Sequence, residues 1–271
     1  MNYKTILINL KKDTDRLEFM TKQLNKLEIP FIRLEAVNGK EYMEKDGSEY
    51  DDREAIKQLG KSATLGEIGC ALSHKRCYQK FLNDPEYQDT KYLLILEDDV
   101  ELNNNFKKIL EEEIQKNEQK YKWNYLQFNY IPGKSLLSAI KEMPLKYKQQ
   151  YIGFINSVNI IFKIKKIPKL ILAPIISTIL DIGKYFQERK KGAHPFIIRI
   201  SFLAGAYLID KKVAEILLDL TEKVSSASDY VTTKLIKHKS KNMNFYFYSP
   251  LIARQKNEKF TSSIDEMEKR V

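Results

Sequence analysis

Cysteine is scarce in this chain, with only Cys70 and Cys77 among 271 residues. Their spacing places both on one face of a helix, and they do not form a CxxC pair. No histidine stands beside them at a spacing that we read as typical of metal ligands. These features exclude a disulfide framework, so we expect a reduced, cytoplasmic protein with buried thiols.

Long apolar runs are also absent. The best candidate, Leu170–Leu180, contains Pro174 and falls well short of the roughly 20 residues that span a bilayer. The first ten residues are too short a segment, and too polar around Asn9, for a signal peptide. We therefore expect neither a membrane-spanning helix nor a secretion signal.

Basic and aromatic side chains are plentiful instead. The formal charge is +10 at pH 7, and there are 16 Tyr and 13 Phe. A basic balance favours anionic partners such as nucleic acid, anionic lipid or phosphorylated small molecules, although a solvated lysine-rich surface explains it equally well. The length suffices for one large buried core, so we expect a single domain over residues 1–255 and a polar tail over 256–271.

Apolar periodicity alternates between strand and helix along the chain. The first strand, helix and strand form a βαβ unit, which predicts parallel pairing. We therefore expect an α/β fold with a Rossmann-type, mostly parallel central sheet flanked by helices. Residues 40–61 are predicted to be a loop with one short helix, residues 151–161 paired short strands, and residues 163–199 a basic and apolar helical insertion. The predicted strands cover 3–8, 31–34, 91–96, 123–129, 201–209 and 245–248, and the predicted helices cover 15–27, 65–82, 106–119 and 211–220.

Three consecutive carboxylates, Glu97, Asp98 and Asp99, follow the apolar strand at 91–96. Adjacent negative charges repel one another, and a divalent cation such as Mg²⁺ or Mn²⁺ offsets that repulsion with oxygen ligands. On an extended backbone Glu97 and Asp99 point to one side and Asp98 to the other. We predict a metal site here, against the alternative of a solvated acidic turn.

Polar residues at other segment ends add weaker signals. Asn9 ends the first strand and can bind a base or ribose, while Arg16 can reach a phosphate. Glu67 and His74 lie on a helix that begins with two glycines, whose free N–H groups suit a phosphate. Each residue has an ordinary structural alternative, namely a turn, a surface cation, a helix cap or a core histidine.

Two further positions stand near the end of the chain. Gly205 precedes a strand among small residues, which permits close approach of a ligand or of another backbone. Asp229 lies in a polar segment ahead of a helix, where it acts as a general base or as a helix cap.

Taken together, these segments resemble glycosyltransferase family 25, the bacterial lipopolysaccharide and lipooligosaccharide galactosyltransferases. The resemblance extends over most of the chain. It rests on Ile8-Asn9-Leu10 with Asp15-Arg16, Ala36-Val37-Asn38-Gly39, Leu65-Gly66-Glu67-Ile68-Gly69-Cys70 with Leu72-Ser73-His74, Leu96-Glu97-Asp98-Asp99-Val100, Gly205-Ala206-Tyr207-Leu208-Ile209, Asp229, and Pro250 with Gln255.

The resemblance implies a GT-A-like fold, a UDP-sugar donor (commonly UDP-galactose), a divalent metal and inversion at the anomeric carbon. It implies a nucleotide-sugar half over 1–130 and an acceptor half over 131–255, with a lipooligosaccharide or lipopolysaccharide glycan as acceptor. Asp229, or alternatively Asp98, is the expected base, and Glu97, Asp98 and Asp99 are the expected metal ligands. The expected donor contacts are Asn9, Leu10, Arg16, Val37, Asn38, Glu67, Ser73, His74 and Gly205.

Three further expectations concern partners and rival classes. The basic and apolar segment 163–199 suits peripheral contact with the cytoplasmic face of the inner membrane, or else a buried helical pair. A nucleic-acid-binding module predicts clustered cations, whereas these are scattered, so we expect no nucleic-acid partner. A Mg²⁺-dependent phosphotransfer enzyme needs an aspartate at the end of the first strand, where Asn9 stands.

Overall fold

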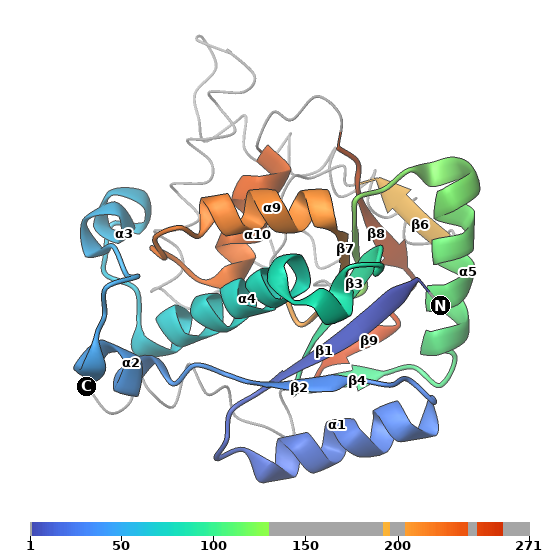
Figure 1. Ribbon diagram of the computed structural model, residues 1–271, viewed down its shortest axis with the longest axis horizontal. Helices are drawn as coiled ribbons and strands as arrows, with labels where there is room; N and C mark the ends of the chain where they lie inside the picture. The colour runs from blue at the N-terminus through green and yellow to red at the C-terminus, as the bar shows by residue number, and fades with distance from the viewer. Residues whose placement is uncertain (1, 130–191, 196–203, 238–242, 257–271) are drawn as a thin grey trace, which may run out of the picture.

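A seven-stranded sheet forms the centre of the computed structural model, which describes residues 2–129, 192–195, 204–237 and 243–256 (Figure 1). The strand order is β2-β1-β3-β7-β5-β8-β6. Three of these strands, β1, β3 and β7, lie next to one another although β7 comes more than 100 residues after β3. The strands are β1 (Tyr3–Asn9), β2 (Ile32–Glu35), β3 (Tyr92–Glu97), β5 (Tyr125–Gln127), β6 (Gly192–Pro195), β7 (Ala206–Asp210) and β8 (Phe245–Ser249).

The sheet is mixed, so the prediction of a mostly parallel sheet was wrong. β1 pairs in parallel with β2 and β3, and β5 pairs in parallel with β8. β7 runs antiparallel to both β3 and β5, and β6 runs antiparallel to β8. The βαβ rule predicted the first three strands correctly but says nothing about a strand that enters the sheet from a distant part of the chain.

Helices cover both faces of the sheet, giving three layers (Figure 1). One apolar cluster joins the sheet to α1 and α5, and a second joins the opposite face to α4, α9 and α10. The short helices α2 and α3 lie beyond α4, and a third small cluster packs α2 against it. The helices are α1 (Thr14–Lys26), α2 (Gly39–Lys45), α3 (Asp52–Leu59), α4 (Leu65–Asn83), α5 (Phe106–Lys116), α9 (Lys211–Leu220) and α10 (Ser228–Lys237), with a 3₁₀ turn at Pro85–Tyr87 and a π turn at Asn117–Tyr121.

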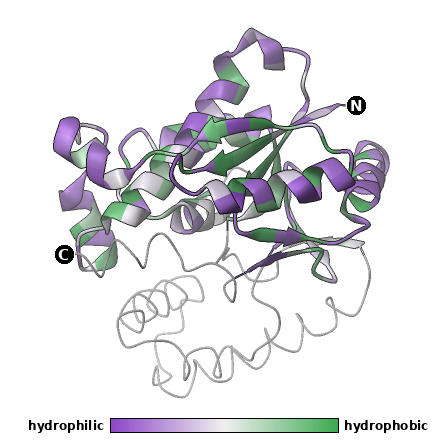
Figure 2. Ribbon diagram, turned by 90° about the horizontal axis from the view of Figure 1, so that it is seen from below, coloured by the Kyte–Doolittle hydropathy of each residue, from purple (hydrophilic) through white to green (hydrophobic). Residues whose placement is uncertain are grey.

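Strand β3 lies in the middle of this core and is apolar on both faces. Leu94 and Leu96 face the α1 and α5 side, whereas Leu93 and Ile95 face the α4 side, and all four are fully buried. Burying one such side chain stabilises the fold by about 1.5–3 kcal/mol. The hydropathy colouring shows the same layering, with apolar strands inside and polar outer helix faces (Figure 2). The core therefore fixes where β3 ends, and with it the position of Glu97.

A second, two-stranded sheet follows directly. β4 (Val100–Leu102) pairs antiparallel with β9 (Ala253–Gln255), and Val100 stands opposite Gln255. This pairing brings a residue from near the end of the chain beside the acidic triplet.

Helix α4 begins at Leu65, the residue at which a helix was predicted to start. Thr64 accepts a hydrogen bond from the backbone N–H of Glu67, and the Glu67 carboxylate accepts one from the N–H of Thr64, which is a capping box. Two other expectations need correction. Residues 40–61 contain two helices, α2 and α3, rather than one, and the described part of the 163–199 insertion, Gly192–Pro195, is an edge strand rather than helix.

The rest of that insertion, the expected short strands at 151–161 and the tail after Lys256 lie outside the described residues. None of the helices in the described ranges is both long and apolar enough to traverse a lipid bilayer.

Candidate active site

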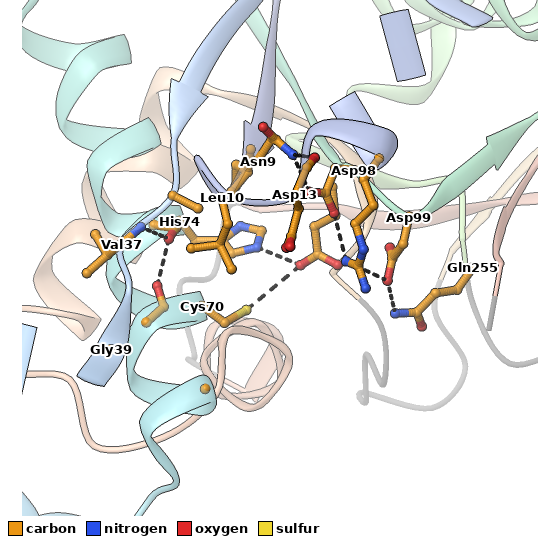
Figure 3. Close-up of a pocket in the computed structure, with 17 residues that line it drawn as sticks. Asn9, Leu10, Asp13, Val37, Gly39, Cys70, His74, Asp98, Asp99 and Gln255 are labelled. Atoms are coloured by element: carbon orange, nitrogen blue, oxygen red, sulfur yellow. Dashed lines mark hydrogen bonds and ion pairs between the residues drawn. The ribbon is translucent and has the colours of Figure 1, made fainter. Parts of the chain in front are cut away.

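A pocket of about 700 Å³, including space open to solvent, lies at the carboxyl ends of β1 and β3 (Figure 3). Its walls come from the end of β1, the turn after β3, the segment before α2, the first half of α4, and Gln255. Ligands of open α/β sheets bind at this edge.

Asp98 is held in this pocket by two neighbours. Asn9 Nδ2 donates to Asp98 Oδ2 at 2.7 Å, and Arg16 Nη1 donates to Asp98 Oδ1 at 3.0 Å. Asn9 is in turn fixed by Arg33, whose Nε donates to Asn9 Oδ1 at 2.9 Å. Burial raises the pKa of Asp98 above its usual value even though the charge of Arg16 opposes the shift. Both carboxylate oxygens of Asp98 thus already have protein donors.

Asp99 is satisfied on one side only. Gln255 Nε2 donates to Asp99 Oδ2 at 2.9 Å, whereas Oδ1 is buried and has no hydrogen-bond partner among the described residues. Burial, together with the charge of Glu97, raises the pKa of Asp99 to about 6. A buried, half-satisfied carboxylate costs free energy unless a cation or a donor reaches it.

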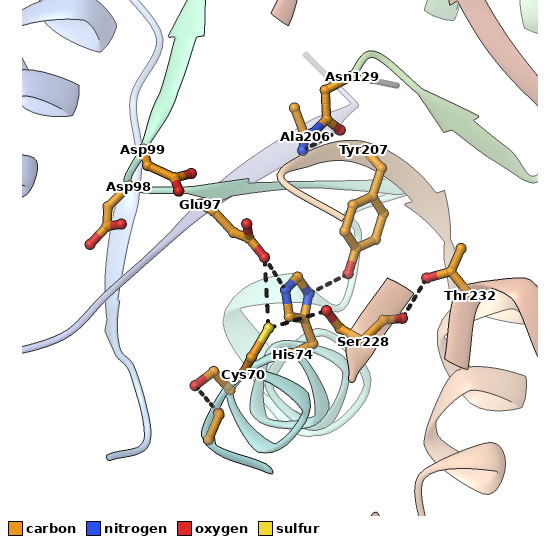
Figure 4. Close-up of polar contacts among 12 residues, drawn as sticks. Cys70, His74, Glu97, Asp98, Asp99, Asn129, Ala206, Tyr207, Ser228 and Thr232 are labelled. Carbon is orange, nitrogen blue, oxygen red and sulfur yellow. Dashed lines mark hydrogen bonds and ion pairs between the residues drawn. The ribbon is translucent and has the colours of Figure 1, made fainter. Parts of the chain in front are cut away.

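Glu97 faces α4. His74 Nε2 lies 2.9 Å from Glu97 Oε1, and Cys70 Sγ lies 3.9 Å from the same oxygen (Figure 4). The other ring nitrogen of His74, Nδ1, lies 2.7 Å from the hydroxyl of Tyr207, which is itself 2.9 Å from the hydroxyl of Tyr78. A buried chain of polar groups therefore orients His74 toward Glu97.

The three carboxylates do not alternate as a continuous strand would place them. Only Glu97 belongs to β3, because Asp98 and Asp99 form a turn before β4. Arg16 Nη1 lies 3.0 Å from Asp98 and 4.0 Å from Asp99, so this guanidinium borders both. Glu97 and Asp99 were expected on one side of the strand and Asp98 on the other. Instead, Asp98 and Asp99 both border Arg16, and the charge of Glu97 raises the pKa of Asp99.

The segment before α2 packs tightly on α4. Ser73 Oγ accepts a hydrogen bond from Val37 N at 2.9 Å and donates one to Gly69 O at 2.6 Å. A Cβ atom at Gly69 would lie 2.5 Å from the carbonyl oxygen of Val37. Val37 and Ser73 line the pocket, as does Leu10. Ser73 therefore lines the pocket and also joins the segment before α2 to α4 through its two hydrogen bonds.

Three expected donor contacts make structural interactions and do not line the pocket. Asn38 caps α2, where its side chain accepts from Lys40 N and Glu41 N. Glu67 takes part in the α4 capping box. Gly205 lets the backbone pack closely: its carbonyl accepts from Glu97 N at 2.8 Å, and an added Cβ would lie 2.8 Å from Asn129 Nδ2.

Asp229 lies in the first turn of α10 rather than in a loop ahead of a helix. It does not line the pocket, although its charge contributes to raising the pKa of Cys70, which does. Burial, with the charges of Glu67 and Glu97, raises the pKa of Asp229 to about 7. A carboxyl group with such a pKa suits proton transfer at neutral pH.

Comparison with known proteins identifies the class of this site. The model of glycosyltransferase family 25, described as an LPS biosynthesis protein, matches residues 2–232. The chain belongs to glycosyltransferase family 25.

Two curated relatives agree with this assignment. A stretch of 110 residues, 40% of the chain, is 37% identical to "Putative glycosyltransferase R655" of Acanthamoeba polyphaga mimivirus and covers 32% of that protein. A stretch of 116 residues, again 40% of the chain, is 32% identical to "Procollagen galactosyltransferase 1-B" of Xenopus laevis and covers 18% of it. The match therefore spans about a third or less of each relative.

Several residues of this family 25 pocket were not among the predicted site residues. Gln255 lies beyond the matched range and reaches the site only through the β4–β9 pairing. Asp13 lines the pocket, and its carbonyl accepts from Asn9 Nδ2 at 2.9 Å. Cys70 and His74 also lie four residues apart on α4, a helical metal-ligand spacing that was not predicted.

Proposed function

We propose that the enzyme transfers a hexose, galactose from UDP-galactose, to a lipooligosaccharide or lipopolysaccharide glycan with inversion at the anomeric carbon. The family match over residues 2–232 carries the proposal, since it makes the chain a glycosyltransferase rather than a phosphotransfer enzyme or a nucleic-acid-binding module. The description of the family as an LPS biosynthesis protein supports the glycan class, and the name of the frog relative, a galactosyltransferase, supports the sugar. The α/β fold is consistent with the GT-A type.

The nucleotide part of the donor is proposed to occupy the pocket at the ends of β1 and β3. Arg16 is preorganised there by its ion pair with Asp98 and supplies positive charge for a phosphate. Asn9 Oδ1 and the backbone carbonyl groups near Val37 are the proposed acceptors for the base and ribose, because Asn9 Nδ2 already donates to Asp13 and Asp98. Hydrogen bonds already hold Asn9 and Asp98, so donor binding requires little reorganisation of these side chains.

Glu97 and Asp99 fit a divalent cation. The buried Oδ1 of Asp99 has no partner in the described part of the chain, and the charge of Glu97 raises the pKa of Asp99. Carboxylate oxygens suit Mn²⁺ and Mg²⁺. When bound, the ion would offset the charge that grows on the UDP leaving group. Asp98 is less suited than its neighbours, because Asn9 and Arg16 occupy its oxygens.

Asp229 is the proposed general base. It removes the proton of an acceptor hydroxyl, and the resulting oxygen nucleophile attacks the anomeric carbon on the face opposite UDP. The new glycosidic bond forms as the bond from that carbon to the phosphate oxygen breaks, and UDP leaves with the electron pair. Asp98 is the alternative base, although its ion pair with Arg16 stabilises the carboxylate and weakens it as a base.

The test is a transfer assay with UDP-galactose and a lipooligosaccharide acceptor, with and without excess EDTA. We expect activity to require Mn²⁺ or Mg²⁺, the product to be β-linked from the α-linked donor, and UDP with Mn²⁺ to raise the melting temperature of the protein. Full activity in excess EDTA would contradict the metal role. Retention of the α-configuration would contradict inversion.

The acceptor side is proposed to involve residues 131–255, including the segment 163–199. A glycolipid acceptor suits the basic and apolar composition of residues 163–199, as does peripheral contact with an anionic inner-membrane leaflet from the cytoplasmic side. Liposome co-sedimentation tests the contact: neutralising the lysines of this segment should reduce binding to anionic vesicles. Binding that is unaffected by those substitutions would count against it.

A further inference from the structure

A thiol, an imidazole and a carboxylate converge on one wall of the pocket. Cys70 and His74 are one turn apart on α4, and Glu97 faces them from the end of β3 (Figure 4). One ligand atom of each residue lies within 4.8 Å of those of the other two. Helical residues at i and i+4 share a face, so both α4 side chains reach the same point.

This donor set differs from an oxygen-only site. Sulfur and imidazole nitrogen are ligands that zinc prefers, whereas Mg²⁺ and Mn²⁺ prefer oxygen. Zinc bonds of about 2.3 Å to sulfur and about 2.0–2.1 Å to nitrogen require ligand atoms roughly 3.5 Å apart in a tetrahedral site. Glu97 Oε1 lies 3.9 Å from Cys70 Sγ and 2.9 Å from His74 Nε2, so the two distances fall on either side of that value.

The surroundings of His74 prepare it as a ligand. When Nδ1 carries the ring proton it donates to the Tyr207 hydroxyl at 2.7 Å, which leaves the Nε2 lone pair pointing at Glu97 and Cys70. A hydrogen bond from the second ring nitrogen is the usual support of a metal-bound histidine. Tyr207 is fully buried and is itself contacted by Tyr78, so the ring orientation is fixed before any ion arrives.

The local charge also favours a cation. Among the described residues that line the pocket, Asp13, Glu97, Asp98 and Asp99 carry carboxylates and Arg16 carries a guanidinium. Negative potential at a water-accessible pocket attracts a divalent ion.

We propose that Cys70, His74 and Glu97 form a zinc site whose occupation inhibits the enzyme. Zinc displaces the thiol proton of Cys70 to solvent and takes the thiolate, the Nε2 atom of His74 and a Glu97 oxygen as ligands, with water in the fourth position. The ion then occupies the pocket and withdraws Glu97 from catalysis. The inhibitory consequence rests on the donor site proposed above, whereas zinc binding does not.

Metal binding is measured first, on metal-stripped enzyme. Cobalt(II), a spectroscopic substitute for zinc, is expected to give a near-ultraviolet thiolate-to-metal absorption band at one ion per chain, which zinc then abolishes. Cys70→Ser should lose the band and at least tenfold in zinc affinity, measured by competition with a chromophoric chelator. Cys77→Ser is the matched control, because Cys77 lies on the same helix but is buried against the sheet, and it should keep both.

A second measurement needs no variant. Zinc should protect Cys70 of the wild-type enzyme from alkylation, read by mass spectrometry, while magnesium should not. Equal zinc affinity in the wild-type and Cys70→Ser proteins, the absence of a thiolate band, or unprotected Cys70 would each overturn the site.

Activity provides the regulatory readout. With saturating Mn²⁺, zinc should inhibit wild-type transfer and the Cys77→Ser variant equally, and Cys70→Ser should need at least tenfold more zinc for half inhibition. Zinc binding without inhibition would overturn the regulatory part. If the enzyme shows the cobalt band but does not bind UDP, the zinc site is supported and the proposed UDP-sugar donor is contradicted.

Discussion

Gln255 and Asp99 are joined by a 2.9 Å hydrogen bond from the side-chain amide to Oδ2, although 156 residues separate them in the sequence. The bond fixes one oxygen of Asp99, whereas the buried Oδ1 has no hydrogen-bond partner among the described residues. The antiparallel pairing of Val100 with Gln255 sets the position of the amide. Gln255 is therefore a positioning residue for the proposed cation site.

Gln255→Leu should weaken metal binding. Removing the donor takes away an interaction that lowers the pKa of Asp99, and it frees the side chain to turn. We expect the apparent Kd for Mn²⁺ to rise about 10–100-fold, measured by metal dependence of transfer and by titration calorimetry. Arg254→Ala, an exposed position on the same strand, is the control. An unchanged Mn²⁺ affinity in Gln255→Leu would remove this role.

Asp99→Asn should stabilise the metal-free protein at neutral pH. The pKa of Asp99 is raised to about 6 in the fold, from a usual value of 3.8, so its ionisation opposes folding. The free energy of unfolding of the wild type therefore falls as pH rises from about 4 through 6. The variant has no carboxyl group at this position and lacks this decrease. We expect a gain of about 1–3 kcal/mol at pH 8 without metal, vanishing at pH 3.5.

Urea unfolding at both pH values measures this difference. Asp15→Asn, an exposed carboxylate of α1, serves as the control. A variant less stable than the wild type at pH 8 in EDTA would show that the ionised Asp99 is satisfied without a cation.

Asp229→Asn should abolish most of the turnover. Loss of a general base costs about 10²–10⁴-fold in kcat. Because burial raises the pKa of Asp229 to about 7 and the base must be ionised, wild-type activity should rise with pH through that value. Asp219→Asn, exposed on α9, is the control and should keep the wild-type pH profile. If the residual activity of Asp229→Asn still rises with pH through about 7, the group that titrates there is not Asp229.

Gly69→Ala should open the wall between α4 and the segment before α2. The added Cβ would meet the Val37 carbonyl at 2.5 Å, so backbone must shift. We expect a loss of about 1–3 kcal/mol in stability and a several-fold higher KM for the donor. Gly60→Ala provides the contrast, since its Cβ meets nothing within 4 Å and its φ of +74° costs stability without touching the pocket. An unchanged KM in Gly69→Ala would contradict this account.

Local sequence patterns were sufficient to predict individual strands and helices. The apolar run at 91–96 predicted β3, and the apolar periodicity over 65–82 predicted α4, because these signals depend on neighbours in the chain. The antiparallel insertion of β7 between β3 and β5 was not predictable in this way. Packing across the whole sheet determines which strands pair with β7, and local strand propensity carries no information about that packing.

The residues of the site likewise fall into those that local sequence predicts and those that depend on distant pairings. Asn9, Arg16 and the acidic triplet were visible because each follows a strand or begins a helix. The bond from Gln255 to Asp99 and the convergence of Glu97 with Cys70 depend on distant pairings. Asn38 and Glu67 carried the same resemblance as their neighbours, yet their side chains cap helices. Sequence resemblance alone does not separate residues that line the pocket from residues that hold its walls.

The order of the strands also determines when the protein can complete its sheet during synthesis. β2, β1 and β3 can pair as soon as the first hundred residues have emerged, but the free edge of β3 waits for β7. At roughly 5–20 residues per second, a ribosome needs on the order of 5–20 s to supply it. Throughout that interval β3, which is apolar on both faces, exposes an unpaired edge, and such an edge can pair with strands of other chains. Yield in the cell should therefore depend on what shields β3 while translation continues.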